Sequence, residues 1–188
     1  MARFFGCSIV LGISGLVLSG CQTTQSTVDR IRIKQAQTAA PNAAQIYCSG
    51  TANCEFERVD KLSVVDATSK RINTAVIKTG WLGLTGQPMS SNGLFLRLPP
   101  QQHEVVIRFY PISAQHAEVF HVIHQFKPQQ RYDFKMYRQA AASTGSLLNV
   151  STPKPLCVDL LQEQRLIRRF CRPYDVVTGV SEFVEKKI

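Results

Sequence analysis

The clearest pattern of apolar and polar positions runs from residue 94 to residue 138, where large apolar side chains recur at alternate positions within short runs. They are Leu94, Leu96, Leu98, Val105, Ile107, Phe109, Phe120, Val122, Phe126, Tyr132, Phe134 and Met136. A period of two predicts strands that bury one face. Turns at 99–102 and 128–130, each containing proline and glutamine, separate these strands. Consecutive strands with regular turns predict a single antiparallel β-sandwich, which we expect to cover residues 47–188 in an all-β domain.

Shorter patterns extend the predicted sandwich on both sides of this block. Residues 55–59 alternate and 62–67 are rich in β-branched side chains, whereas 71–81 fit a helix or a strand. The stretch 80–93, rich in glycine and serine, predicts a long loop that is either a disordered connection or a functional rim. The other expected elements are a strand at 146–150, a hairpin of 156–161 with 166–171, and a strand or short helix at 176–183.

The beginning of the chain has the parts of an export signal. Arg3 is followed by an apolar run from Ile9 to Leu18, and small residues precede Cys21. The run is shorter than the roughly 20 residues of a membrane-spanning helix, so an uncleaved helix is the weaker interpretation. Residues 1–20 are therefore expected to be a signal peptide. Residues 21–46, polar and without an aromatic side chain, are expected to form a flexible tether, unless they order on contact with a partner.

The tetrapeptide Leu18-Ser19-Gly20-Cys21 resembles the lipobox of bacterial lipoproteins at all four positions. This resemblance implies cleavage before Cys21, a thioether-linked diacylglycerol on its sulfur and an acyl group on its new amine. Several acyl chains make a stable membrane anchor, where a single chain is marginal. Gln22, in place of an aspartate after the cysteine, resembles the cargo of the outer membrane. The expected location is therefore the outer membrane, with the domain in the periplasm. An ordinary signal peptide that releases a soluble protein is the alternative.

The overall charge limits the partners only in combination with this location. The chain has 22 Lys and Arg against 13 Asp and Glu, a formal net charge of +9. In a cytoplasmic protein, a basic surface of this kind would point to nucleic acid as a ligand. An exported protein rarely meets nucleic acid, so this ligand is disfavoured. The remaining functional interpretation is attraction to anionic envelope surfaces such as lipopolysaccharide, phospholipid or peptidoglycan. A solvated basic surface without a ligand explains the same composition.

Four cysteines remain if Cys7 is removed with the signal peptide and Cys21 is lipid-modified. An oxidising periplasm favours disulfides, and among the three pairings we predict Cys48–Cys54 and Cys157–Cys171. The first closes a tight turn that contains glycine and asparagine. The second joins the two strands of the predicted hairpin, with residues 163–165 as its loop and Leu161 opposite Ile167. Zinc binding is disfavoured, because no Cys-x-x-Cys pair is present.

The block from Leu96 to Phe134 also resembles a family of small modules. Its Leu-x-Leu-Pro-Pro turn, His103, alternating strand and Tyr132-x-Phe134 ending resemble the transthyretin-like or PEGA-type β-sandwiches of bacterial surface lipoproteins. The family's usual turn glycines are replaced here by glutamines. The resemblance implies a β-sandwich fold. The whole chain resembles uncharacterised gamma-proteobacterial outer-membrane lipoproteins, which implies no specific task.

The sequence offers no recognisable catalytic motif. A serine nucleophile needs an elbow such as Gly-x-Ser-x-Gly, which the chain lacks. Paired cysteines are poor nucleophiles. His121 and His124 would share a helix face, but a spacing of three places them on opposite faces of a strand, which disfavours a shared metal. We therefore expect no catalytic residue, no cofactor and no metal.

The function expected from these features is that of a non-enzymatic accessory or binding module in an envelope assembly, with a protein partner. A binder of anionic envelope ligands is the alternative, and an enzyme of unrecognised type is the third. The candidate partner contacts are Trp81, Arg165, Arg168, Arg169 and Arg172. Arg168 and Arg169 are neighbours on a predicted strand and point to opposite faces, so they form no single patch.

Overall fold

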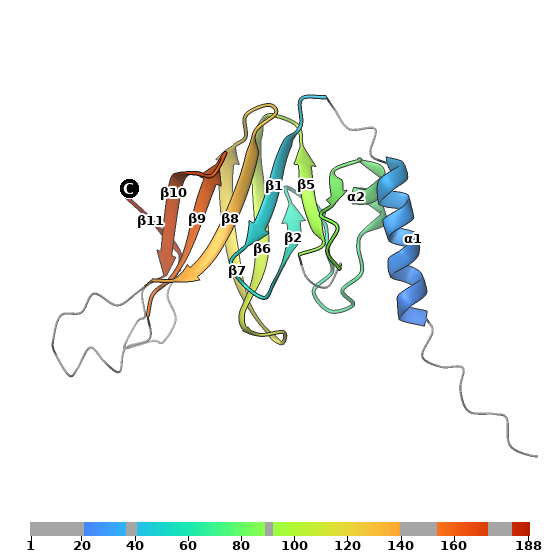
Figure 1. The fold of residues 1–188 in the computed structure, drawn as a ribbon, viewed down its shortest axis with the longest axis horizontal. Coiled ribbons are helices and arrows are strands. Elements are labelled where there is room, and N and C mark those ends of the chain that lie inside the picture. Colours follow the sequence, from blue (N-terminus) through green and yellow to red (C-terminus); the bar gives the residue numbers. More distant parts are fainter. Residues whose placement is uncertain (1–20, 37–40, 89–91, 140–153, 173–181) are drawn as a thin grey trace, which may run out of the picture.

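The alternating segments form two packed β-sheets in the computed structural model (Figure 1). The structure describes residues 21–36, 41–88, 92–139, 154–172 and 182–188. Its elements are α1 (Cys21–Ala36), β1 (Ala44–Ser49), β2 (Asn53–Val59), β3 (Leu62–Ser63), α2 (Thr74–Lys78), β4 (Leu82–Leu84), β5 (Leu94–Leu98), β6 (Gln102–Ser113), β7 (His116–Gln125), β8 (Arg131–Arg138), β9 (Leu156–Gln162), β10 (Arg165–Arg172) and β11 (Val184–Lys186). The predicted all-β, sandwich-like fold is confirmed.

The strand order shows how the two sheets are built. Seven strands form one sheet in the order β11-β10-β9-β8-β1-β5-β4, and four form the other in the order β3-β2-β6-β7. Most neighbours are antiparallel, as predicted. One pair is not: β1 runs parallel to β8, with Ile46 opposite Tyr132. Because these strands lie more than 80 residues apart in the chain, no turn constrains their relative direction.

The core lies between the sheets and is formed by the alternating side chains that the sequence marks. Phe56, Ile107, Phe120 and Phe134 have no exposed surface, and their strands come from both sheets. Phe120 packs its ring against Phe134, with ring centroids 5.9 Å apart. Each of these rings removes a large apolar area from water, which is the main favourable term for a domain of this size.

The predicted flexible tether is wrong in this structure, because most of it is folded. Residues 21–36 form the four-turn helix α1, and β1 already begins at Ala44, inside the range assigned to the tether. Ile33 is 1% exposed and belongs to the hydrophobic core cluster, and Ala36 packs against that cluster. The helix lies beside α2 and β4, at the edge of the seven-stranded sheet (Figure 1).

The buried face of α1 is not evident from the sequence, because only one residue of that face is strongly apolar. The buried and half-buried positions Ser26, Asp29, Ile33 and Ala36 follow the spacing of three and four that a packed helix requires. Asp29 is 4% exposed and lies 3.7 Å from the Arg32 guanidinium. The apolar residues Val28 and Ile31 lie outside this set, and Ile31 is exposed.

A glycine allows α1 to approach the body of the protein closely. Gly80 has φ +73, and a Cβ atom at this position would lie 2.7 Å from the carbonyl oxygen of Ala36. Any other residue would clash with the last turn of α1 and would also be strained by the positive φ. Gly80 also donates its N–H to Ile77 at the end of α2. The last turn of α1 is therefore fixed against the α2–β4 connection.

Both predicted disulfides are present. Cys48–Cys54 joins β1 of the seven-stranded sheet to β2 of the four-stranded sheet, so it links the two layers of the sandwich at their shared turn. Cys157–Cys171 joins the neighbouring strands β9 and β10. In the chain-entropy account, the second bridge closes a 15-residue loop and contributes about 3 kcal/mol of stability.

The β9–β10 hairpin differs from the predicted register near its turn. The turn has two residues, not three, and Glu163 and Gln164 both have positive φ. This conformation is typical of a type I′ turn, whose twist matches that of the flanking strands. A bulge at Ile167 then restores the register, so Leu161 lies opposite Leu166 while Cys157 still lies opposite Cys171.

The ambiguous segments also have defined structures. The segment 71–81 contains the short helix α2, whose Asn73 caps the Ala75 N–H at 2.9 Å. The predicted loop 80–93 contains the three-residue strand β4. The strand expected at 146–150 lies outside the described residues, as does most of the element expected at 176–183.

Candidate functional site

The two ends of the sandwich carry different candidate features. We call one the Cys21 end: it contains the first turn of α1, residues 50–52 and the β6–β7 hairpin turn. Figure 1 shows these three segments at the lower side of the view. We call the opposite one the Pro99 end, with the turns at 60–61, 99–101, 127–130 and 163–164. Because α1 is fixed at Ala36, Cys21 lies about 22 Å away along the helix, toward the Cys21 end.

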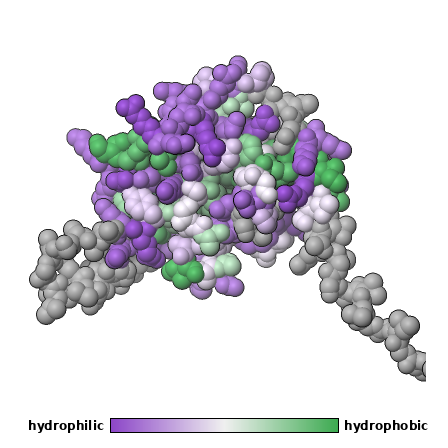
Figure 2. Space-filling view, in the orientation of Figure 1, coloured by the Kyte–Doolittle hydropathy of each residue, from purple (hydrophilic) through white to green (hydrophobic). Residues whose placement is uncertain are grey.

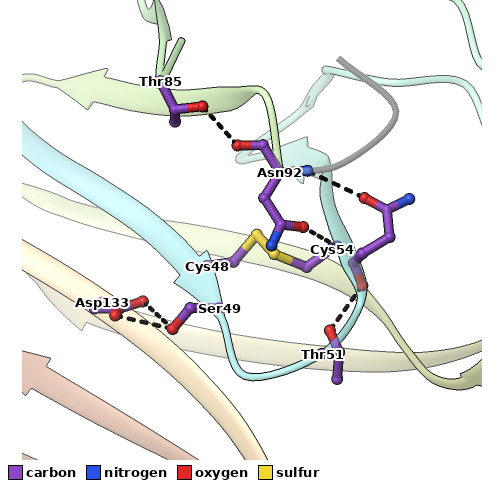
Figure 3. The surroundings of a disulfide bond; sticks show 8 residues. Cys48, Ser49, Thr51, Cys54, Thr85, Asn92 and Asp133 are labelled. Atoms are coloured by element: carbon purple, nitrogen blue, oxygen red, sulfur yellow. Dashed lines mark hydrogen bonds between the residues drawn. A yellow bond between two sulfur atoms is a disulfide. The ribbon is translucent and has the colours of Figure 1, made fainter. Parts of the chain in front are cut away.

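The disulfide Cys48–Cys54 organises the turns at the Cys21 end (Figure 3). The Asn92 side chain accepts a hydrogen bond of 2.5 Å from the Cys54 N–H. The backbone N–H of Asn92 donates to the side-chain oxygen of Asn53 at 3.2 Å. Thr85 donates to the Asn92 carbonyl at 2.9 Å. The β4–β5 connection is thus tied to the β1–β2 turn, and the Cys21 end is held together by specific contacts.

A small open cavity of about 320 Å³ lies beside this turn. Its walls come from the β1–β2 turn at Gly50 to Ala52, from Pro111, and from the ends of β8 and β9. Tyr137 and Arg138 give it a polar rim. The cavity has the size of a site for a small molecule, but none of its lining residues is a cysteine, a histidine or a carboxylate. The titratable side chains of these walls are Tyr137 and Arg138.

The arginines of β10, predicted as partner contacts, mostly pair with carboxylates of this chain. Arg169 makes two hydrogen bonds to Asp159, at 2.7 and 2.8 Å, and Arg172 donates to Glu118 of β7 at 2.7 Å. Arg168 binds Glu185 of β11 through Nε and Nη2, at 2.7 and 2.8 Å. Its Nη1 donates to the carbonyl of Ile123 in β7.

These ion pairs close one side of the sandwich. Arg168 and Arg172 extend from the seven-stranded sheet to β7, the edge strand of the four-stranded sheet. Arg169 instead pairs with Asp159 on the neighbouring strand β9, so Arg168 and Arg169 contact different parts of the chain. Arg165 is exposed beside the hairpin turn. Of the four arginines, Arg165 has no ion pair with another of the described residues.

Trp81, the fifth predicted contact, is half-buried and packs against the core cluster. Its ring meets the His103 ring edge-on, with centroids 5.9 Å apart. It lies near β4 and β5, at the opposite edge of the seven-stranded sheet from β10. The predicted contacts are therefore not brought together, and Trp81 covers the end of the core.

A polar cluster that sequence analysis missed lies on the outer face of the four-stranded sheet. The Arg108 guanidinium is 4% exposed, donates through Nε to Glu55 at 2.8 Å and through Nη2 to the Val65 carbonyl at 2.8 Å. Lys70 and Tyr110 also donate to Glu55. Burial alone would raise the pKa of Glu55, but these hydrogen bonds and the Arg108 charge hold it below its usual value. The signal in the sequence is an arginine between Ile107 and Phe109, within the otherwise apolar run 105–109.

A second ionic group lies on the same face, closer to the Pro99 end. Glu104 accepts from Arg58 at 2.8 Å and contacts His121 Nε2 at 2.5 Å. The hydrogen bond from Arg58, with the contribution of His121, lowers the pKa of Glu104 to about 2. Because this pKa is depressed, the contribution of ionised Glu104 to the stability of the fold is present above the ordinary glutamate pKa. It is lost as the pH falls toward 2. Screening by solvent keeps it small at this exposed position.

Buried His103 and partly exposed Asp60 have the residue types of an acid–base dyad, but both are engaged by neighbours. His103 is 1% exposed, with Nδ1 2.7 Å from the Asp60 carboxylate and Nε2 3.2 Å from the Pro99 carbonyl. The other Asp60 oxygen accepts the N–H of Glu104 at 2.9 Å. No ring nitrogen is left to receive a substrate proton, and the pair connects the 60–61 and 99–101 turns with β6.

Two further findings concern metals and membranes. Within the described ranges, no group of three or more His, Cys, Asp or Glu side chains is arranged to hold a metal ion. Among the helices that the structure describes, none is long and apolar enough to cross a bilayer.

His121 and His124 point to different environments: His121 contacts Glu104, and His124 packs against Phe126 and Tyr132.

Comparison of the chain with protein-family models, with curated proteins and with solved structures finds no match.

His124 generates a testable pH dependence. Its ring packs edge-on against Phe126 and Tyr132, at centroid distances of 4.9 and 5.4 Å. Burial, with the nearby Arg168 and Lys127 charges, lowers the pKa of His124 to about 4. The unfolded chain binds this proton near pH 6.5, so the native state loses stability as the pH falls from 6.5 to 4. We expect a loss of about 1–2 kcal/mol after allowing for partial exposure.

The matched control is His124→Phe, which keeps an aromatic ring but cannot titrate. Urea unfolding at several pH values measures the free energy of unfolding of both proteins. The wild-type curve is expected to fall relative to the variant between pH 6.5 and 4, and the His124 ring protons are expected to titrate near pH 4 in NMR spectra. Parallel stability curves would contradict the assignment.

Proposed function

We propose that the chain is a lipoprotein of the bacterial outer membrane, held by lipid on Cys21 and facing the periplasm. The observation that carries the proposal is the lipobox-like Leu18-Ser19-Gly20-Cys21, which follows a short apolar run. The two disulfides use all four cysteines beyond Cys21. They support an oxidising compartment and leave the sulfur of Cys21 as the lipid acceptor. Cys21 is also the first residue of α1, so the helix follows the acylated residue directly.

In this proposal the domain acts as a non-enzymatic accessory or binding module of an envelope assembly. The acid–base groups of the described residues support that role, because His103, Asp60 and Glu55 are engaged by neighbours of the same chain. The β10 arginines favour a protein partner over an anionic glycan or lipopolysaccharide, since Arg168, Arg169 and Arg172 are already paired with carboxylates. Loops and edge strands of small sandwiches suit the docking of partner chains.

Acylation is tested by replacing the acceptor cysteine. Wild-type protein, expressed in bacteria with an alkyne-bearing fatty acid, is expected to incorporate the label and to sediment with membranes. Mass spectrometry of its first peptide should show Cys21 as the amino-terminal residue with acyl mass. Cys21→Ser is expected to lose the label, because serine offers no thiol for the thioether bond. Cys7→Ser, which changes a cysteine inside the leader, is the matched control and should keep it. An unmodified Cys21 in the mature protein would contradict the proposal.

The accessory role is tested in the same membranes by crosslinking. A photo-crosslinking residue at Arg165, the exposed arginine beside the β9–β10 turn, is expected to capture one reproducible envelope protein. The control places the same residue at Ile31, on the exposed side of α1. The alternative function predicts instead that the protein sediments with peptidoglycan or lipopolysaccharide and that added salt releases it, because exposed charge attraction is screened. Salt-sensitive sedimentation without a protein crosslink would favour that alternative.

A further inference from the structure

Three connections at the Cys21 end contain no lysine, arginine, aspartate or glutamate. The β1–β2 turn is Gly50-Thr51-Ala52, the described residues 85–88 and 92–93 between β4 and β5 are uncharged, and so are residues 110–117 around the β6–β7 turn. Charged residues make up 19% of the chain, so three uncharged connections at one end are a marked local depletion. Other connections at this end carry charge: Arg138 and Lys154 flank the one between β8 and β9, and Lys70, after β3, is paired with Glu55.

The turns at the Pro99 end have the opposite character. Asp60 and Lys61 form the β2–β3 turn, Lys127 begins the β7–β8 turn, and Glu163 lies in the β9–β10 turn. Charged groups keep this end hydrated. Transfer of the three uncharged connections out of water therefore costs less than transfer of the charged turns at the Pro99 end, and α1 directs Cys21 toward the end with the uncharged connections.

The β6–β7 turn also exposes an apolar side chain. Ile112 is 74% exposed, the highest value among the large apolar side chains of the described residues. It follows Pro111 near the end of β6, just before the turn between Ser113 and His116. Figure 2 shows a mostly hydrophilic surface with a few apolar areas, one of them at this lower end. Transfer of an exposed isoleucine side chain from water into an apolar phase is favourable.

Two cations flank this end on the seven-stranded sheet. Arg138 lies at the end of β8 and Lys154 precedes β9, and both are exposed. The Arg138 guanidinium donates to the Lys154 carbonyl at 3.3 Å, so the two residues are neighbours. An exposed isoleucine with basic side chains at the rim fits a bilayer surface, where the apolar group enters the interface and the cations meet phosphate groups.

We propose that the Cys21 end of the sandwich lies against the bilayer, with Ile112 inserted into the lipid interface. This orientation rests on the proposed acylation of Cys21. A flexible tether would leave every face of the domain free to meet the membrane. The docked helix α1 instead fixes the lipid attachment point relative to the uncharged turns. The membrane is then contacted at two places, the acyl chains at the start of α1 and the β6–β7 tip.

Tryptophan fluorescence with brominated lipids tests this orientation in the acylated full-length protein. Bromine quenches only a tryptophan that enters the bilayer. The protein is reconstituted in vesicles of phosphatidylethanolamine and phosphatidylglycerol, with and without bromine on the acyl chains. The native Trp81 packs beside His103 near the Pro99 end and provides the baseline. Ile112→Trp adds a reporter at the Cys21 end, and Gln101→Trp adds a matched reporter at an exposed, uncharged position of the Pro99 end.

The emission added by Ile112→Trp is expected to shift to shorter wavelength and to lose most of its intensity in brominated vesicles. The emission added by Gln101→Trp should keep its intensity. Both positions are exposed, so neither substitution removes a core contact. Equal, weak quenching of the two reporters, or stronger quenching at residue 101, would overturn the orientation.

Mass spectrometry of each preparation before reconstitution separates the two proposals. A preparation without acyl mass contradicts the proposed lipoprotein and removes the basis of the orientation as well. Acylated, vesicle-bound protein with an unquenched reporter at residue 112 contradicts the orientation alone. In that case the uncharged end is available to a protein partner instead of lipid.

Discussion

The docking of α1 on the sandwich is the constraint on which the account depends. One apolar side chain, Ile33, is buried in the core, and one glycine, Gly80, lets the Ala36 carbonyl approach the α2–β4 connection. Together they fix the last turns of the helix. Because a helix is stiff, they also fix the direction of Cys21, about 22 Å away. A lipid on Cys21 would thus be attached at a defined end of the domain.

The remainder of the structure keeps that end intact. Cys48–Cys54 joins the two sheets at the β1–β2 turn, and Asn92 ties the β4–β5 connection to the same turn. On the other side, Arg168 and Arg172 hold β10 against β7. At the Pro99 end, His103 and Asp60 join the 60–61 and 99–101 turns to β6 through partly buried hydrogen bonds. The polar side chains that resemble catalytic groups therefore serve mainly to hold the sandwich together.

The sequence predicted those parts of the fold that depend on local pattern. Alternation from Leu94 to Met136 located β5 to β8, and the spacing of the four cysteines gave both disulfides. The hairpin register was predicted from Cys157–Cys171 and failed only at the turn. There the positive φ of Glu163 and Gln164 and a bulge at Ile167 replaced the expected loop, and no glycine marked the turn.

The missed features depend on contacts between distant parts of the chain. The buried face of α1 includes Asp29, so its periodicity is not apolar, and its docking partner Gly80 lies more than 40 residues away. The parallel pairing of β1 with β8 has no local signal. For the candidate contacts, sequence identified arginines on β10 but not their partners, because Glu118 and Glu185 come from other strands. The grouping of three uncharged connections at one end was also visible only after the strand order was known.

Amide hydrogen exchange along α1 tests the central claim most directly. If the helix is docked through Ile33, the amides of residues 33–36 exchange slowly, as in a packed element, and Ile33→Ala removes that protection. Ile31→Ala, on the exposed side of the same helix, leaves it unchanged. Exchange of these amides at the rate of an unstructured chain in the wild-type protein, or equal effects of the two variants, would contradict the docking of α1.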